Sequence, residues 1–377
     1  MPTDTQVDRA LELIQKSGGN YEYFFEKLSS PSWIEPLAKR GRFDHPPGIE
    51  RIGNMYRFPP WPEGEYLLRM ADVAPEEVAA AIKPVCFASD NHIVHRLLVE
   101  TTRKLPPALA RDLALQEAAW VREQDSLIPL YPEKAAALVE HLATGGEPGA
   151  ALELASAILE VRAPKGTRKG TPSEAEDGGT IDWKPAPDPE AKLEPVWSQL
   201  FLRTVTEPLS LSIPDGFLDA LAENLNRAVT IHSSNQQDKS DDYSTIWRPH
   251  LEHSSHYEAL NESVSALIGT IKFLCSQPVD HTQQILRALQ PYTWPIFDRM
   301  RAFTLLHGAH ADPDLVARFL NEPHRYARAP GNPEFTELLK KQASALPKDV
   351  LAEILERIDR GPDPASYAYH LQHRVPP

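Results

Sequence analysis

The feature that most constrains the fold of this chain is the recurrence of apolar side chains three and four positions apart, interrupted by proline. This spacing places them on one face of an α-helix, and it continues through most of the 377 residues. The most apolar stretch, which we expect to be central, carries Val264, Leu267, Ile268, Ile271 and Leu274. Prolines stand at expected helix starts, as in Pro75-Glu76-Glu77, because the first turn tolerates proline and favours acids. The sequence therefore predicts a series of helices joined by stiff corners.

Proline outnumbers glycine by 36 to 18, which reverses the usual order and argues against a β-rich fold with glycine turns. Successive helix pairs recur at roughly 35–45 residues, the range of HEAT-like and armadillo-like repeats. Such pairs bury their faces against neighbouring pairs, so we predict an all-α fold, an irregular α-solenoid of HEAT/armadillo-like helix pairs. The alternative is a pair of unrelated helical bundles. The one β element that we expect is a small hairpin near residues 49–58.

A change in composition divides the chain. Apolar residues become scarce between residues 164 and 192, where glycine, proline and charged residues dominate. A segment of this composition cannot bury enough surface to order itself, so we predict a flexible linker or disordered loop at 164–192. Two helical-repeat halves flank it, an N-terminal half at 1–163 and a C-terminal half at 193–377.

The net charge of −14 disfavours nucleic acid as a partner, unless a local basic groove overrides it. The two cysteines, Cys86 and Cys275, lie far apart in apolar contexts, which predicts buried free thiols in a reducing compartment. No stretch approaches the ~18 consecutive apolar residues of a membrane span, and the N-terminus lacks the features of a signal peptide. We therefore expect a cytoplasmic protein without membrane contact.

Sequence motifs for catalysis or cofactor binding are not found in this chain. It contains no phosphate-binding G-x-x-x-x-G-K-[ST] loop and no dinucleotide-binding G-x-G-x-x-G sequence. It also lacks the G-x-S-x-G sequence that presents a nucleophilic serine, and no motif surrounds either cysteine. We therefore predict a protein that is not an enzyme and that takes no cofactor.

Three histidines at a spacing of three residues, His250, His253 and His256, form a weak alternative metal site, as in a metal-dependent hydrolase. Two histidines on one helical turn can share a metal, but this stretch is polar and reads as a loop. The same spacing recurs at His92 and His95, which makes it less diagnostic. We therefore predict no metal, and we expect His92 and His95 to face solvent or a helix groove.

Aromatic residues and prolines cluster between residues 23 and 70. The aromatic members of the cluster are Trp33, Phe43, Phe58, Trp61 and Tyr66. They could line a groove for a peptide. We interpret them instead as part of an N-terminal cap, because the terminal repeats of a solenoid must cover an apolar face.

A polar loop that contains tryptophan and arginine is the best candidate for a binding site. Its candidate residues are Asp242, Tyr243, Thr245, Trp247 and Arg248. Tryptophan and arginine are enriched in the hot spots of protein interfaces, so this loop predicts contact with a partner. The competing interpretation is that Trp247 only packs the loop against the helices.

Two stretches carry a resemblance to a known group of proteins. The first contains Phe24-Phe25-Glu26-Lys27-Leu28, Phe43-Asp44-His45-Pro46-Pro47 and Phe58-Pro59-Pro60-Trp61-Pro62, and the second is Asp241-Asp242-Tyr243-Ser244-Thr245-Ile246-Trp247-Arg248-Pro249. Through them, most of the chain resembles the HEAT-like helical-repeat region of large bacterial proteins associated with antiviral defence. The resemblance implies a sensor or scaffold that works with an effector or ATPase domain, attached or encoded nearby. It carries over no catalytic residue.

These observations lead to one functional prediction and one alternative. We predict a non-enzymatic scaffold or recognition module of a bacterial defence-type system, which binds a protein partner through the concave face of a helical array. The alternative is a HEAT-like nucleic-acid-binding or processing protein. Steeply salt-dependent binding of DNA or RNA would distinguish the alternative from the main prediction.

Overall fold

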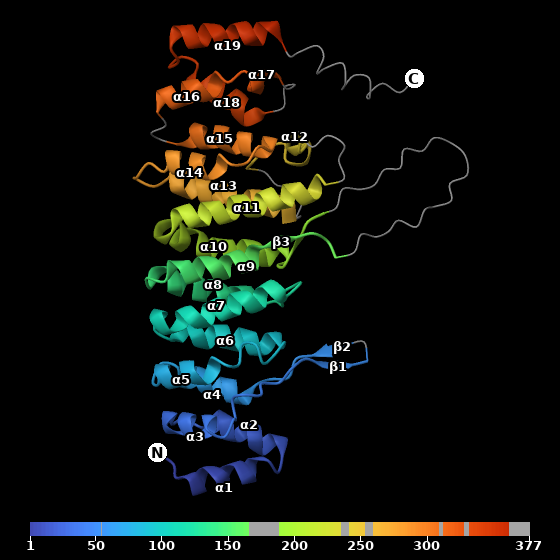
Figure 1. Ribbon diagram of the computed structural model, residues 1–377, viewed down its shortest axis with the longest axis vertical. Coiled ribbons are helices and arrows are strands. Elements are labelled where there is room, and N and C mark those ends of the chain that lie inside the picture. The colour runs from blue at the N-terminus through green and yellow to red at the C-terminus, as the bar shows by residue number, and fades with distance from the viewer. Residues whose placement is uncertain are drawn as a thin grey trace, which may run out of the picture. The chain divides into compact units, whose positions relative to one another are not determined.

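The computed structural model of the chain describes residues 1–53, 55–165, 188–234, 241–252, 259–308, 312–327 and 332–361. Helices dominate these residues, and the two small sheets in them have two strands each (Figure 1). This confirms the predicted all-α class with a small hairpin. No described helix is both long enough and apolar enough to cross a lipid bilayer.

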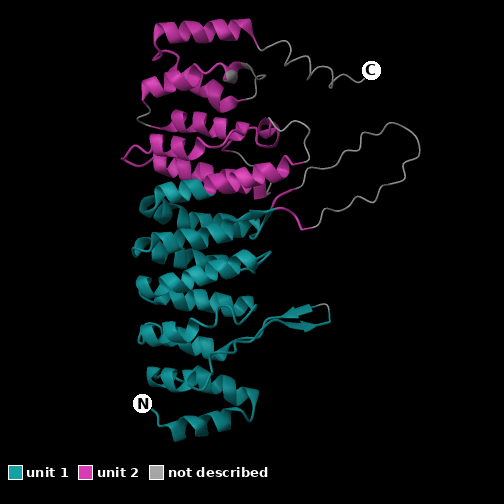
Figure 2. Ribbon diagram, viewed as in Figure 1, with its two compact units in different colours: residues 1–162, 190–220 teal, residues 163–189, 221–377 magenta. Residues whose placement is uncertain are grey.

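The chain divides into two compact units (Figure 2). Unit 1 comprises residues 1–162 and 190–220, and unit 2 comprises residues 163–189 and 221–377. The helices of unit 1 are α1 (Asp4–Ile14), α2 (Gly18–Lys27), the 3-10 helix η1 (Pro31–Trp33), α3 (Ile34–Ala38), α4 (Pro62–Met70), α5 (Pro75–Ile82), α6 (His92–Lys104), α7 (Pro107–Glu123), α8 (Tyr131–Thr144), α9 (Pro148–Leu159) and α10 (Pro195–Ser212). The helix α11 (Pro214–His232) begins in unit 1 and continues into unit 2.

The helix starts of unit 1 follow the local signals in the sequence. Proline occupies the first position of α4, α5, α7, α9 and α10, where its missing N–H removes no helical hydrogen bond. The side chain of Thr3 caps α1 together with Gln6, and Asn91 caps α6 by accepting a hydrogen bond from the backbone N–H of Ile93. The prolines predicted to mark helix starts are thus confirmed at the first positions of these helices.

Two layers of helices form unit 1. The odd-numbered helices α1, α3, α5, α7 and α9 contact one another in this order, and the even-numbered helices α2, α4, α6, α8 and α10 do the same. Neighbours in sequence, such as α7 and α8, join the two layers, so every helix pair is buried against the next pair. Within unit 1 this is the arrangement of a stacked helical-repeat protein, in which each pair depends on its neighbours for a core.

A β-hairpin interrupts the helices of unit 1 between α3 and α4. Its strands β1 (Glu50–Ile52) and β2 (Met55–Arg57) are antiparallel, with Glu50 opposite Arg57 and Ile52 opposite Met55. Gly53 begins the turn with a φ of 62°, a left-handed conformation that glycine adopts without steric cost. The hairpin extends away from the helices (Figure 1). It confirms the β element expected near residues 49–58.

The second small sheet lies at the edges of the predicted linker. Strand β3 (Val161–Arg162) pairs with β4 (Glu190–Ala191). The next residue, Lys192, is buried and donates to the backbone carbonyls of Val121 (2.7 Å) and Arg122 (3.2 Å) at the end of α7. Burial lowers the pKa of Lys192 to about 8, although its contact with Glu160 acts in the opposite direction. Residues 190–192 therefore belong to unit 1, with Lys192 buried, whereas residues 166–187 of the predicted linker lie outside the described residues.

The division of the chain lies further along than the composition indicates. The predicted C-terminal half begins at residue 193, but α10 packs against α8 and α9 and belongs to unit 1. The physical reason is that the even layer continues across the 164–192 stretch, so that α10 covers the apolar face of α8. The two compact units meet within α11, after Ala220.

Unit 2 is also helical. Its further helices are α12 (Ser244–Trp247), α13 (Ala259–Cys275), α14 (Thr282–Leu289), α15 (Pro295–His307), α16 (Pro313–Leu320), α17 (His324–Ala327), α18 (Pro333–Gln342) and α19 (Lys348–Arg360). Helix α15 contacts α13, α14 and α18. The five apolar residues predicted for a central helix all lie in α13 and are all buried. A second apolar cluster joins α15 to α16, α18 and α19.

Three of the five aromatic residues of the predicted cap lie in the interior of unit 1. Phe43, Trp61 and Tyr66 are buried, while Trp33 and Phe58 are partly exposed. The hydroxyl of Tyr66 donates to the backbone carbonyl of Ser30 at 2.8 Å, which ties α4 to the segment before η1. Helix α1 precedes this stretch and packs on α2 and α3. The buried rings therefore serve the packing of the first helix pairs, which supports the structural interpretation over a peptide groove.

A buried carboxyl group in this region predicts a pH-dependent stability. Glu63, in the first turn of α4, is 7% exposed and accepts a hydrogen bond from the hydroxyl of Tyr21. Burial raises the pKa of Glu63 to about 7, with a smaller opposing contribution from its own backbone N–H. Between the pKa of the unfolded state and this value the folded state keeps a proton that the unfolded state releases, so stability falls as the pH rises through this window.

We expect Glu63→Gln to remove this part of the pH dependence. Relative to the variant, the wild-type protein should lose about 2–3 kcal/mol of unfolding free energy between pH 4.5 and pH 7, because a proton kept across each pH unit is worth about 1.4 kcal/mol. Urea unfolding at several pH values measures the difference. Glu65→Gln, an exposed change on the same helix, is the control. Parallel curves for the wild type and the Glu63 variant would contradict the prediction.

Candidate functional site

The predicted binding segment at 242–248 is anchored by a buried carboxylate. Asp242 is fully buried, and its two carboxylate oxygens accept hydrogen bonds from the backbone N–H groups of Ser244 (2.8 Å) and Ile296 (2.7 Å). Burial raises the pKa of Asp242, and these donors oppose the rise. Tyr243, between Asp242 and Ser244, has a φ of 52° and so turns the chain into α12. Asp242 therefore fastens α12 to the first turn of α15.

Arg248, at the end of the same segment, is also used inside unit 2. It is 2% exposed and donates to the backbone carbonyl of Leu251 (2.6 Å), to the side-chain oxygen of Asn261 (3.1 Å) and to the hydroxyl of Ser265 (3.1 Å). Burial lowers the pKa of Arg248 to about 10, and the positive charge of Arg299 contributes. The guanidinium group thus joins the segment to α13.

The remaining members of the predicted site lie nearer the surface. The indole N–H of Trp247 donates to the backbone carbonyl of Asp242 at 2.7 Å, and its ring is partly exposed. Tyr243 and Thr245 are exposed. The structure thus keeps the five predicted residues close together, with Asp242 and Arg248 facing inward and Tyr243 and Thr245 facing outward. Tyr243, Thr245 and the partly exposed ring of Trp247 can be reached by a partner without unfolding of the segment.

A buried ion pair that the sequence prediction missed supports the backbone of the 242–248 segment. Arg299 of α15 and Glu334 of α18 form two hydrogen bonds of 2.8 and 3.0 Å, with side chains that are 1% and 7% exposed. Arg299 also donates to the backbone carbonyls of Ser244 (2.9 Å) and Arg248 (2.7 Å), and Glu334 accepts from the backbone N–H of Leu251 (3.1 Å). The sequence carried one signal of this ion pair, since Arg299 lies at helical spacing among the apolar residues of α15.

Of the three histidines of the alternative metal site, the structure describes His250. His250 is exposed, just after α12, whereas His253 and His256 lie outside the described residues. His92 and His95, expected to face solvent or a helix groove, do not face solvent. His95 is fully buried and His92 is 9% exposed, because α6 is enclosed by its contacts with α4, α7 and α8.

His95 belongs to a buried cluster of four polar side chains in unit 1. Its Nδ1 atom lies 2.9 and 3.0 Å from the two carboxylate oxygens of Glu117, on α7. The hydroxyl of Tyr131 donates to the same carboxylate at 2.8 Å, and the thiol of Cys86 donates to it at 3.4 Å. The members come from the loop after α5, from α6, from α7 and from the first residue of α8. We call Cys86, His95, Glu117 and Tyr131 the Glu117 cluster.

The hydrogen-bond partners define where the protons of the cluster lie. The Nε2 atom of His95 faces the backbone carbonyl of Ser89 at 3.0 Å, so this nitrogen must carry a hydrogen. Its Nδ1 atom faces the carboxyl group of Glu117, which also accepts from Tyr131 and Cys86. The cluster is then a hydrogen-bonded pair of His95 and Glu117 with two further donors. A buried pair of this kind costs desolvation, and its hydrogen bonds offset that cost.

Burial suppresses the acid–base and nucleophilic chemistry of the neutral members. The pKa of the Cys86 thiol is raised by burial and by the negative charge of Glu117, and the pKa of Tyr131 is raised for the same reasons. A thiol reacts as its thiolate, so Cys86 in this state is a weak nucleophile. The indole of Trp120 stacks on the ring of His95 with 3.4 Å between ring centroids and shields it further.

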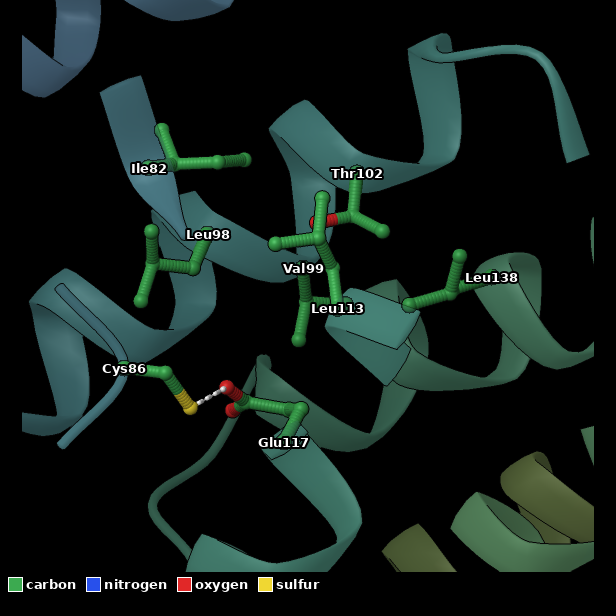
Figure 3. Close-up of a pocket in the computed structure, with 8 residues that line it drawn as sticks. All are labelled: Ile82, Cys86, Leu98, Val99, Thr102, Leu113, Glu117 and Leu138. Atoms are coloured by element: carbon green, nitrogen blue, oxygen red, sulfur yellow. Dashed lines mark hydrogen bonds between the residues drawn. The ribbon is translucent and has the colours of Figure 1, made fainter. Parts of the chain in front are cut away.

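A small cavity adjoins the Glu117 cluster. Cys86, Glu117 and Thr102 provide its polar atoms, and apolar side chains from α5 to α8 form the rest of its lining (Figure 3). Figure 3 shows the Cys86 thiol and the Glu117 carboxylate side by side at one end.

The sequence carried a signal for the Glu117 cluster of the same kind as that for Arg299, a polar residue at helical spacing among apolar ones. Glu117 lies four residues after Leu113 and three before Trp120, on the apolar stripe of α7.

The loop that precedes α6 connects the cluster to the β-hairpin. Three consecutive residues hold the base of the hairpin: the hydroxyl of Ser89 donates to the carbonyl of Pro47 (2.8 Å), Asp90 accepts from the N–H of Ile49 (2.9 Å), and Asn91 donates to the carbonyl of Pro59 (2.8 Å). The carbonyl of Ser89 is also the partner of His95. The hairpin is therefore fixed at its base, while all six strand residues are exposed.

Comparisons with protein-family models, with curated proteins and with solved structures found no match for this chain. The functional argument therefore rests on the residues and geometry described above.

Proposed function

We propose that this chain is a non-enzymatic protein-interaction module, a scaffold or recognition component of a bacterial defence-type system. The observation that carries the interaction role is the β1–β2 hairpin, a rigidly anchored ribbon with exposed apolar side chains. The defence-type context rests on the resemblance of residues 24–67 and 241–249 to helical-repeat regions of defence proteins. An effector or ATPase encoded nearby is the first partner to test.

The exposed side chains of the hairpin have the chemistry of an interface. Ile52, Met55 and Tyr56 are 54%, 72% and 65% exposed. Single exposed apolar residues are ordinary, but these three stand within five positions on one ribbon. Methionine and aromatic residues are enriched at protein interfaces. A two-stranded ribbon is marginally stable by itself, so the clamp at residues 89–91 is what keeps it ordered for binding.

The charges of the hairpin indicate the kind of surface that it fits. Ile52 and Met55 share one face of the ribbon with the ion pair between Glu50 and Arg57 (3.3 Å). Arg51 lies opposite Tyr56 on the other face. The strands carry two arginines and one glutamate, so they are locally basic in an otherwise acidic chain. We infer a partner protein with an apolar depression bordered by carboxylates, which suits both faces.

The interior location of the polar clusters supports the same role. The Glu117 cluster and the Arg299–Glu334 pair both direct their hydrogen bonds to protein groups within their own unit. We predict that the concave face of the helical array and the hairpin are the surfaces that bind a partner. Helical-repeat stacks present extended surfaces of this kind to their partners.

The test compares partner capture by the wild type and by a hairpin variant, Met55→Ser combined with Tyr56→Ser. We expect the variant to fold with a stability within about 0.5 kcal/mol of the wild type, because the changed side chains are exposed. Its affinity for the captured partner should fall about 10–100-fold, since two interface anchors are worth a few kcal/mol together.

Capture from the native host identifies the partner, and calorimetry with the purified partner then measures the affinity. Val73→Ser is the matched control, because Val73 is 66% exposed in unit 1 but lies after α4, away from the hairpin strands. Equal affinity of the hairpin variant and the control would contradict the proposed contact. Steeply salt-dependent binding of DNA by the wild type would overturn the proposed class of partner.

A further inference from the structure

We propose that Cys86, His95 and Glu117 form a binding site for one divalent transition-metal ion of the zinc class. This inference is independent of the hairpin and of its partner. It concerns the interior of unit 1, where the ion would join the end of α5 to α6 and α7.

The positions of the donor atoms fit a metal site. The Sγ atom of Cys86, the Nδ1 atom of His95 and a carboxylate oxygen of Glu117 all lie within 4.8 Å of one another. Zinc binds sulfur at about 2.3 Å and nitrogen or oxygen at about 2.0–2.2 Å, so its tetrahedral ligands stand about 3.3–3.8 Å apart. The thiol lies 3.4 Å from the carboxylate, and Nδ1 lies 2.9 Å from it. An outward shift of less than about 1 Å therefore makes room for the ion.

The surroundings of His95 orient its ring as those of a metal ligand. Metal-binding histidines usually donate the hydrogen of their other nitrogen to a carbonyl or a carboxylate, which fixes the tautomer. Here Nε2 donates to the carbonyl of Ser89, and this leaves Nδ1 for the ion. The stacked indole of Trp120 holds the His95 ring in place, and the hydrogen bond from Tyr131 holds the Glu117 carboxylate in place.

The charge balance of the site allows a metal ion to enter a buried position. When the ion binds, the thiol of Cys86 loses its proton to solvent, and Nδ1 of His95 binds the ion as the nitrogen without a hydrogen. The charges of the ion, the thiolate and the carboxylate then sum to zero, with a neutral imidazole. The exchange thus places no net charge in the interior, where an unbalanced ion would be costly.

The cavity beside the cluster supplies space for a fourth ligand. The Cys86 thiol and the Glu117 carboxylate both line it at one end (Figure 3). Zinc sites with three protein ligands take a water molecule as the fourth, and a polar wall at this end of the cavity suits one. Apart from Thr102, the remaining lining is apolar, which favours a structural ion over a catalytic one.

Cobalt binding to the full-length chain tests the proposal, because cobalt substitutes for zinc and reports its ligands by colour. The protein is refolded with Co²⁺ or Zn²⁺ and, separately, with a chelator, since the buried site must fill while the chain folds. We expect about one ion per chain by elemental analysis, release of the thiol proton when the ion binds, and a thiolate-to-cobalt charge-transfer band. The metal-loaded protein should also unfold at a higher temperature than the chelated protein.

Matched variants assign the ligands. Cys86→Ser should lose the charge-transfer band and weaken cobalt binding by about 10–100-fold or more, whereas Cys275→Ser, the other free thiol, should retain both. His250→Ala controls for binding by the exposed histidine. If Cys86→Ser does not fold, the band of the wild type together with its retention in Cys275→Ser still identifies the thiolate. Substoichiometric metal in the wild type, or a band that depends on Cys275, would overturn the proposal.

Discussion

Replacing Trp61 with alanine is expected to lower the unfolding free energy by about 3–5 kcal/mol, because the change removes a fully buried indole ring from unit 1 and leaves a cavity. Trp61 is 2% exposed and stands immediately before α4. Its ring lies directly on Gly64: an added Cβ atom there would stand 2.1 Å from Cε3 of Trp61 and 2.6 Å from a methyl group of Leu97. The ring therefore fills the contact between α4 and α6.

Denaturant unfolding measured by circular dichroism checks this expectation. Trp61→Phe should cost much less, about 1–2 kcal/mol, because most of the volume is kept and the indole N–H of Trp61 has no hydrogen-bond partner in the described part of the chain. Tyr23→Ala is the surface control, since Tyr23 is 62% exposed on α2. A Trp61→Ala protein of wild-type stability that had lost a binding partner would show that the ring belongs to a binding groove.

Replacing Arg299 with alanine is the second change with a large expected effect, about 3–5 kcal/mol of unfolding free energy in unit 2. The change leaves the carboxylate of Glu334 buried without its charged partner. Among the described residues, the backbone N–H of Leu251 still donates to it. It also removes the donors to the carbonyls of Ser244 and Arg248, so the 242–251 segment loses its support. Most of the cost comes from the unpaired charge and not from the loss of an attractive pair.

A double variant separates these two contributions. Arg299→Met combined with Glu334→Leu removes both charges, and we expect it to be more stable than Arg299→Ala by several kcal/mol, on the order of 2–4. Arg287→Ala, an exposed change on α14, is the control and should lie within about 0.5 kcal/mol of the wild type. Equal losses in the single and double variants would show that packing, and not the stranded charge, dominates.

Much of the fold could be predicted because its signals are local. Prolines at the first positions of α5, α7 and α18, together with apolar spacing of three and four, mark helix starts and buried faces within a few residues. The hairpin near residues 49–58 was predictable for the same reason. The end of unit 1 was not, because α10 joins it through the face of α8, some sixty residues earlier in the chain.

At the candidate sites, local sequence signals did not predict which side chains contact each other. Asp242 and Arg248 were predicted together as a surface loop, yet their partners are Ile296, 54 residues away, and Asn261. His95 was predicted to face solvent or a helix groove, yet it is fully buried. Its partner Glu117 lies on the next helix, 22 residues along the chain. Periodicity identifies a buried face, but it does not say which polar residue on that face has a partner on another helix.

The sequence by itself therefore determined the helices, their proline starts, the hairpin and the all-α class, since each depends on backbone preferences and side-chain spacing within a few residues. Only the tertiary structure decided that His95, Glu117, Cys86 and Tyr131 meet in one cluster, and that Arg299 and Glu334 support the 242–251 segment. The physical reason is that a buried charge is tolerated only beside its counter-group, and that group is brought there by helix packing across long stretches of chain.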